Sequence, residues 1–186
     1  MRLIALILIA LLFALPLRAD TAADTAPVLP DPMLKRIKAA PDRFLDLAAL
    51  LIHGFGAAGR VDRAGVERSI SLDRAGARAS ALRRLLAADL DGDGAVGSDE
   101  IAVAAGAASA TTRARLITTH ARADADSDGT VSPAELADHA GAQSLRQVSE
   151  ADAALARAVL ACDQDGDGAV TMAEVRRALV ALDPAT

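Results

Sequence analysis

Apolar side chains recur at helical spacing in four stretches of the chain, at 41–53, 79–88, 113–123 and 151–162. Leu82, Leu85 and Leu86 show the pattern in the second stretch, and Phe44 and Leu51 belong to the first. A repeat of three to four residues places apolar groups on one face of a helix. The pattern therefore predicts four amphipathic helices separated by polar loops.

The composition supports a helical fold. Apolar residues make up 52 % of the 186 residues, but aromatic residues only 2 %. Alanine, leucine and arginine, which are frequent here, have high helix propensity. We therefore expect an all-α protein of one or two small domains, with a core of Leu, Val, Ile and Ala.

The last three predicted helices are each followed by an acidic stretch of twelve residues. These stretches are "DLDGDGAVGSDE" (89–100), "DADSDGTVSPAE" (124–135) and "DQDGDGAVTMAE" (163–174). Each has Asp at positions one, three and five, Gly at six, Val at eight and Glu at twelve. Their spacings of 35 and 39 residues indicate a repeated structural unit. Carboxylates this close repel one another, so the pattern predicts a bound cation.

The order of residues fits Ca²⁺, which takes six to eight oxygen ligands in irregular geometry. Glycine at position six permits a sharp turn, and the final glutamate can give two oxygens. The expected ligands are Asp89, Asp91, Asp93, Ala95 and Glu100; Asp124, Asp126, Asp128, Thr130, Ser132 and Glu135; and Asp163, Asp165, Asp167, Ala169, Thr171 and Glu174. Position seven would contribute its carbonyl, and Ser132 and Thr171 would act directly or through water. Mg²⁺ is the chemical alternative, although it seldom uses so many protein oxygens.

All three stretches resemble the EF-hand calcium loop. Dockerin modules use similar loops, but the full helix before each loop favours an EF-hand. The resemblance implies helix–loop–helix units that work in pairs, and about three calcium ions per chain.

A fourth unit is predicted 35 residues before Asp89. The stretch "GFGAAGRVDRAG" (54–65) keeps Gly59 at position six and Val61 at position eight, but it lacks the ligands. We interpret it as a degenerate first hand, with chance similarity as the alternative. The resemblance then implies one EF-hand pair at 33–105 and a second at 111–183, joined by the small-residue linker 104–112. In this arrangement Val61 would lie beside Val96.

The N-terminal segment has the pattern of a secretory signal. Arg2 precedes an apolar run at 3–15, and the small residue Ala19 follows. The run is shorter than the roughly 20 residues of a membrane-spanning helix, so an uncleaved anchor is the weaker alternative. Cleavage near Ala19, or else after Ala23, predicts a periplasmic or secreted protein. We expect residues 20–32, which contain three prolines, to be disordered.

The charge of the mature chain suits a cation-binding protein. Residues 1–19 hold two arginines and no acid, so 18 basic and 25 acidic residues remain, a net charge of −7. This balance argues against nucleic acid as a partner, and no membrane contact is expected after signal cleavage. The lone Cys162 reads as a small buried apolar residue, with an intermolecular disulfide as the alternative.

No enzyme motif is present, because His53, His120 and His139 are scattered and no nucleophile or phosphate-binding signature occurs. We therefore expect a calcium-binding protein and no enzyme. Few methionines follow the signal, only Met33 and Met172, which favours an exported calcium buffer or calcium-stabilised module. The alternative is a calcium sensor that binds an unidentified protein through an opened apolar groove.

Overall fold

A computed structural model describes residues 28–182 of the chain. The expected signal at 1–19, and residues 20–27 of the expected lead-in, lie outside the described residues. At the end of that lead-in, Asp31 and Pro32 already belong to a helix, so these two residues are not disordered. Among residues 28–182, no helix has both the length and the apolar character needed to cross a membrane.

The described chain is mostly helical, as predicted, with four short strands. In order, its elements are α1 (Asp31–Ala39), α2 (Pro41–Phe55), β1 (Arg60–Asp62), α3 (Arg63–Leu86), β2 (Val96–Gly97), α4 (Ser98–Gly106), α5 (Ala110–Ala123), β3 (Thr130–Val131), α6 (Pro133–Gln147), α7 (Glu150–Ala158), the 3-10 turn η1 (Val159–Cys162), β4 (Ala169–Thr171) and α8 (Met172–Leu182). The four helices expected from the apolar pattern all occur within these elements.

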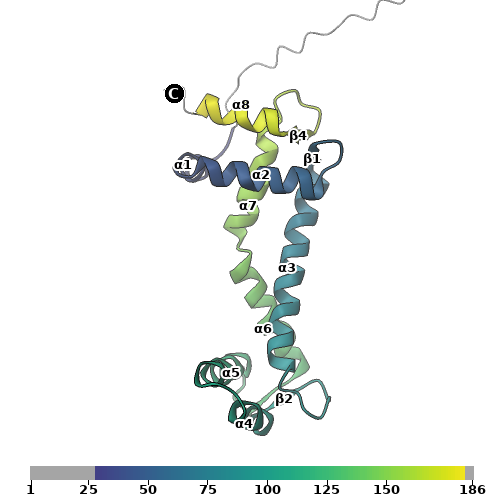
Figure 1. Ribbon diagram of the computed structural model, residues 1–186, viewed down its shortest axis with the longest axis vertical. Coiled ribbons are helices and arrows are strands. Elements are labelled where there is room, and N and C mark those ends of the chain that lie inside the picture. Colours follow the sequence, from purple (N-terminus) through teal and green to yellow (C-terminus); the bar gives the residue numbers. More distant parts are fainter. Residues whose placement is uncertain (1–27, 183–186) are drawn as a thin grey trace, which may run out of the picture.

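Two lobes lie at opposite ends of an elongated molecule (Figure 1). The terminal lobe contains α1, α2, β1, the start of α3, α7, η1, β4 and α8. The distal lobe contains the end of α3, β2, α4, α5, β3 and the start of α6. Helix α3 runs from the terminal to the distal lobe, and α6 returns alongside it.

The strand pairing differs from the expected one. Strand β1 pairs antiparallel with β4, so Val61 lies opposite Val170. Strand β2 pairs antiparallel with β3, which places Val96 opposite Val131. The prediction that Val61 lies beside Val96 is therefore wrong. The first loop is paired with the last, and the two middle loops are paired with each other.

The cause of this difference is the length of α3. This helix has 24 residues, which at 1.5 Å per residue span about 36 Å. Since it leads from loop 54–65 to loop 89–100, it holds these two loops at opposite ends of the molecule. The ranges 33–105 and 111–183 consequently each contribute to both lobes. Residues 104–112 do not link the lobes, because they join α4 to α5 within the distal lobe.

The two lobes have separate apolar cores. The terminal core gathers sixteen buried residues from α1, α2, β1, α3, α7, η1, β4 and α8, including Phe44, Leu51 and Val61. Cys162 belongs to it and is buried, as expected, and burial raises the pKa of its thiol to about 12. The distal core has only seven buried residues, among them Leu85, Ile101 and Leu136. The terminal lobe thus has a much larger apolar core than the distal lobe.

Candidate metal sites

Each acidic loop lies between the end of one helix and the first turn of the next. The loops share two left-handed backbone positions, at residues four and six. Gly94, Gly129 and Gly168 at position six have φ between 85° and 90°. Such φ values are readily adopted by glycine and disfavoured for other residues. These glycines therefore allow the chain to turn back on itself around the centre of each loop, as the sequence predicted.

Three carboxylates converge in each loop. They come from positions one, three and twelve, and in each group one oxygen per residue lies within 4.8 Å of the others. The groups are Asp89, Asp91 and Glu100; Asp124, Asp126 and Glu135; and Asp163, Asp165 and Glu174. Residues eleven positions apart are thus brought together three times in the same way. Such a set of oxygens is the kind of ligand shell that a hard divalent cation uses.

Backbone N–H groups fix the aspartate at position one. In the first acidic loop, Asp89 Oδ1 accepts the N–H of Gly92 at 2.7 Å and Oδ2 accepts that of Gly94 at 3.1 Å. Asp163 makes the equivalent bonds with Gly166 and Gly168, at 2.8 and 3.0 Å. Each aspartate is therefore oriented by the loop's own backbone.

Asp124 differs from its two counterparts. Its Oδ2 accepts the N–H of Gly129 at 3.1 Å, but Oδ1 is buried and accepts no hydrogen bond within residues 28–182. Position four of this loop is Ser127, not glycine, although its φ is also positive, at 62°. A buried carboxylate oxygen without a partner is costly. A cation at the centre of the loop would supply the missing partner, so the donor set of this loop fits a bound metal.

Both oxygens of the glutamate at position twelve are held by the backbone. Glu135 Oε1 accepts the N–H of Ala125 at 2.7 Å, and Oε2 accepts that of Ser132 at 2.9 Å. Hydrogen bonds from Ser132 and Ala125 lower the pKa of Glu135 to about 2. Hydrogen bonds from Gly97 and Leu90 likewise lower the pKa of Glu100. These glutamates are therefore ionised near neutral pH and have the charge that a metal ligand needs.

Glu174 has the same arrangement in a more enclosed place. It is 3 % exposed, and its oxygens accept the N–H groups of Gln164 and Thr171 at 3.2 and 2.8 Å. The Thr171 hydroxyl also donates to Oε2 at 2.7 Å. Burying a carboxylate is unfavourable unless its charge is compensated. These hydrogen bonds provide part of the compensation, and a cation in the loop would provide more.

The remaining expected ligands take other positions. The aspartates at position five lie outside the three carboxylate groups, and each accepts the N–H of position seven at 2.7–2.8 Å. The hydroxyls of Ser132 and Thr171 donate to the glutamate at position twelve and accept its N–H, which closes a capping box. Ala95, Thr130 and Ala169 follow position six, and Thr130 and Ala169 lie in strands.

Repulsion among the carboxylates of the last loop affects the pKa of Asp165. The N–H of Asp167 donates to Asp165 and lowers the pKa of this carboxyl, but desolvation and the charges of Asp167, Glu174 and Asp163 outweigh it and raise the pKa. A cation bound there would reverse this effect, because a nearby positive charge stabilises the ionised form.

Loop 54–65 is a tight turn with no carboxylate at positions one, three, five and twelve. Its one acidic residue, Asp62 at position nine, caps α3 by accepting the N–H of Gly65 at 2.8 Å. The backbone N–H and carbonyl groups of Ala57 and Arg60 bond to each other at 2.9 and 3.1 Å, and Ala58 and Gly59 have positive φ. A Cβ at Gly56 would lie 2.2 Å from the carbonyl oxygen of Arg60. The chain itself therefore fills the space close to Gly56.

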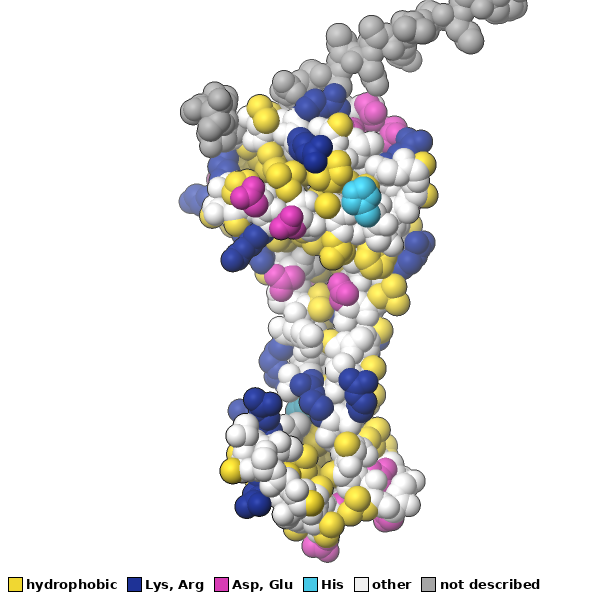
Figure 2. Space-filling model, viewed as in Figure 1, with side chains coloured by type: hydrophobic (Ala, Val, Ile, Leu, Met, Phe, Trp, Pro, Cys, Tyr) yellow, Lys and Arg dark blue, Asp and Glu magenta, His cyan; other side chains and the backbone are white. Residues whose placement is uncertain are grey.

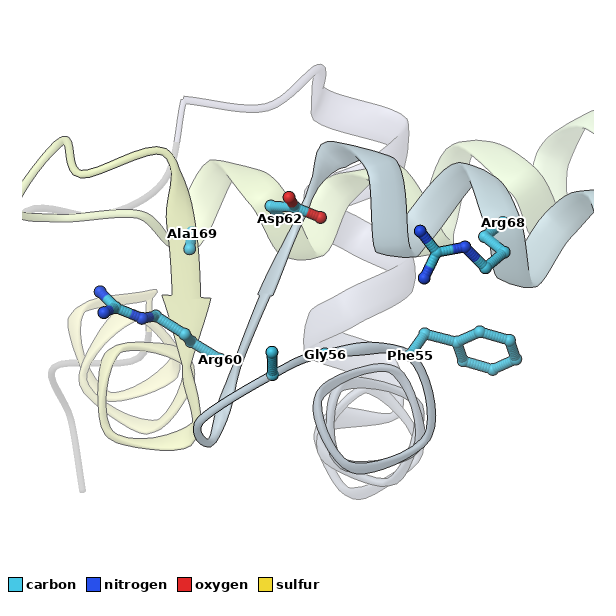
Figure 3. Close-up of a pocket in the computed structure, with 7 residues that line it drawn as sticks. Phe55, Gly56, Arg60, Asp62, Arg68 and Ala169 are labelled. Carbon is cyan, nitrogen blue, oxygen red and sulfur yellow. The ribbon is translucent and has the colours of Figure 1, made fainter.

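Arg60 is a charged residue at these sites that sequence reasoning missed. Its Nη1 lies 2.6 Å from Asp167 Oδ2, in the last acidic loop. Figure 3 shows Arg60 extending from the turn towards Ala169 and β4. The two residues are 107 positions apart, so only the pairing of β1 with β4 could have indicated the contact.

Comparison with protein families identifies one of the loops directly. Residues 121–138 match the family model of the EF hand, and this match includes the whole of loop 124–135. Comparison with curated proteins found no match. Comparison with solved structures found no match either.

Proposed function

Since residues 121–138 match the EF-hand family model, we propose that the chain binds calcium through all three acidic loops, as a buffer or a calcium-stabilised module rather than an enzyme. The observation that carries the proposal is the convergence of the carboxylates at positions one, three and twelve in each loop. Loops 89–100 and 163–174 repeat the hydrogen bonds of loop 124–135 at their glutamates. The same function is therefore assigned to all three.

Within each loop, the residues would divide the work of holding the ion. The aspartates at positions one, three and five and the glutamate at twelve would supply carboxylate oxygens, and position seven its carbonyl. Ser132 and Thr171 would act mainly through Glu135 and Glu174, because their hydroxyls already donate to these side chains. Ca²⁺ is favoured over Mg²⁺ because it accepts many protein oxygens in irregular geometry.

Loop 54–65 is proposed to be a degenerate hand that supports its neighbour without binding an ion. Its strand β1 takes the position of a loop partner for β4, with Val61 opposite Val170. Its sequence offers no carboxylate at positions one, three, five and twelve. The four units would thus form two pairs, first with fourth and second with third.

Calcium titration of the whole protein, followed by native mass spectrometry, tests the stoichiometry. Three calcium adducts are expected, and no adduct at millimolar calcium would overturn the proposal. Glu135→Gln should remove bidentate ligation and weaken one site by at least tenfold. Asp138→Asn is the matched control. Asp138 is exposed and lies three residues after Glu135 in α6, and its substitution removes the same negative charge. An equal effect of both variants would mean that Glu135 acts only through overall charge.

A second candidate function, a calcium sensor, is favoured by a groove in the distal lobe. The groove has a volume of about 400 Å³ and is lined by Arg83, Arg84, Leu85, Ala87, Thr112, Arg115, Leu116 and Thr119, from the end of α3 and from α5. Lys and Arg side chains gather where the pair of helices α3 and α6 reaches this lobe (Figure 2). An acidic partner segment with apolar side chains would complement such a groove.

Fluorescence of an anionic apolar dye separates the two functions. A sensor should bind the dye only with calcium, and Leu116→Ser should abolish the signal. A buffer or calcium-stabilised module should show no rise in dye binding when calcium is added.

Export is proposed on the pattern of Arg2 to Ala19 alone. N-terminal sequencing of the mature protein should then begin close to Asp20, and recovery of Met1 would refute export by this signal.

A further inference from the structure

The three acidic loops differ at position five. Asp167 in the last loop is in an ion pair with Arg60, at 2.6 Å between Nη1 and Oδ2. Asp93 and Asp128, at the same position of the other loops, are in no ion pair formed within residues 28–182. The cation comes from loop 54–65, which has no carboxylate at positions one, three, five and twelve. One of three otherwise similar sites therefore carries an internal positive charge.

The backbone fixes where this charge lies. In the β1–β4 ladder Arg60 is opposite Thr171, at position nine of the last loop. The positive φ values of Ala58 and Gly59, 51° and 76°, form the turn that precedes Arg60. Gly56 packs so closely against the Arg60 carbonyl that a Cβ there would clash at 2.2 Å. The turn and the ladder together keep Arg60 in reach of Asp167.

We propose that Arg60 lowers the calcium affinity of loop 163–174 by competing with calcium for Asp167. The inference rests on the proposed calcium binding and adds the residue that tunes one site. Loop 54–65 then has a function in addition to pairing: it replaces an ion site by a side chain that regulates the neighbouring site.

The competition follows from the bonds that Asp167 already makes. Its Oδ1 accepts the N–H of Ala169 at 2.8 Å, and its Oδ2 is bound by the guanidinium. Both oxygens therefore accept hydrogen bonds, whereas in Asp93 and Asp128 only Oδ1 accepts one within residues 28–182. Calcium must displace the guanidinium or bind beside it, and two positive charges next to the same carboxylate repel each other.

The size of the effect is limited by exposure. The side chains of Arg60 and Asp167 are 51 % and 37 % exposed, so water and salt screen the pair. Exposed pairs contribute at most about 1 kcal/mol, which corresponds to about a fivefold change in a dissociation constant. We therefore expect Arg60→Gln to tighten calcium binding by loop 163–174 two- to fivefold.

Site-resolved NMR titration of the full chain with calcium tests this. The amides of Gly94, Gly129 and Gly168 report the three loops separately. In Arg60→Gln only the midpoint of Gly168 should move, to lower calcium, and Arg60→Lys should stay close to the wild type. Arg63→Gln is the matched control. Arg63 is exposed and lies three residues after Arg60, and its substitution removes the same positive charge.

The outcomes distinguish this inference from the calcium function itself. If Gly168 responds to calcium with the same midpoint in wild type and Arg60→Gln, calcium binding stands and the role of Arg60 is refuted. Weaker binding in Arg60→Gln also refutes it, because Arg60 would then be organising the loop. If Arg63→Gln tightens calcium binding by loop 163–174 equally, the effect is one of overall charge, and the specific role of Arg60 is refuted. If Gly168 responds in neither protein, the calcium function of this loop fails.

Discussion

The two lobes differ in how the negative charge of their clustered carboxylates is balanced. In the distal lobe, both paired loops have the full set of acidic residues, and their strands β2 and β3 are two residues long. In the terminal lobe, one acidic loop is paired, over three-residue strands, with loop 54–65, whose only acidic residue is Asp62 at position nine. That second loop supplies the guanidinium of Arg60 to the acidic loop. The terminal lobe therefore contains a counter-charge of its own, whereas no ion pair within residues 28–182 reaches the two acidic loops of the distal lobe.

The apolar cores of the two lobes differ in size, and the terminal lobe again has the greater internal stabilisation. Sixteen buried residues form the terminal core and seven the distal core. Hydrophobic stabilisation increases with the apolar area that is buried. A lobe with a small core and two groups of repelling carboxylates should be marginally stable until calcium binds. Together with the proposed calcium binding, this comparison predicts that calcium orders mainly the distal lobe, and four experiments test the difference between the lobes.

Calcium removal should have the largest effect, and it should be concentrated in the distal lobe. Each site contributes about 2.7 kcal/mol of stability at a calcium concentration 100 times its dissociation constant, so two sites give about 5 kcal/mol. Hydrogen exchange with and without a chelator measures the effect. Amides of α4 and α5 should lose protection, whereas those of α2 and α8 should change less. Equal losses in both lobes would contradict the comparison.

Val61→Asp tests which loops are paired. Val61 is fully buried in the terminal core, and an unpaired charge there should destabilise the lobe by about 4 kcal/mol or more. Calcium binding reported by Gly168 should weaken, while Gly94 and Gly129 keep their midpoints. Val96→Asp is the mirror-image variant and should affect Gly94 and Gly129 only. If Val61→Asp instead shifts Gly94, the observed strand pairing is not that of the protein in solution.

Gly56→Ala tests the tight turn that positions Arg60. The added Cβ would lie 2.2 Å from the Arg60 carbonyl oxygen and 2.5 Å from that of Ile52, so backbone must shift, at a cost of about 1–3 kcal/mol. Thermal unfolding measures the loss. Gly54→Ala is the control, because nothing lies within 4 Å of a Cβ there. A variant at Gly56 as stable as that at Gly54 would show that the turn is not closely packed.

Acid should weaken the contact between α3 and α7 by a small amount. Arg157 binds Glu67 through two hydrogen bonds, at 2.6 and 3.0 Å. Hydrogen bonding to the Arg157 side chain lowers the pKa of Glu67 below its ordinary value of 4.5. Because the folded-state pKa is lowered, the stabilisation is fully present above pH 4.5 and is lost as the pH falls through the folded-state pKa. The pair is partly exposed, so the loss should stay below about 1 kcal/mol.

Denaturant unfolding of Arg157→Gln at several pH values checks this. The variant should be less stable than the wild type at pH 7, and the difference should shrink below pH 4.5. Arg177→Gln, which removes a charge from an exposed position of α8, should show no such pH-dependent difference. A constant difference across the pH range would mean that Arg157 acts through packing and not through its charge.

The acidic loops could be read from the sequence because their pattern is local. Asp, Gly and Glu at fixed positions within twelve residues define the turn and the carboxylate group, and backbone hydrogen bonds within the same loop complete it. Helix positions followed for the same reason, since apolar spacing reflects which face of a helix is buried. The burial of Cys162 was likewise indicated by its place at the end of an apolar stretch.

The pairing of the loops was decided by tertiary structure. Glycine, serine and charged residues between Arg63 and Gly76 obscured the continuation of α3, so its full length was not evident. Once that helix is continuous, the first and second loops cannot meet, and the first meets the last. The ion pair of Arg60 with Asp167 follows only from this meeting. Contacts across 107 residues depend on the path of the whole chain, and no local pattern of residues encodes them.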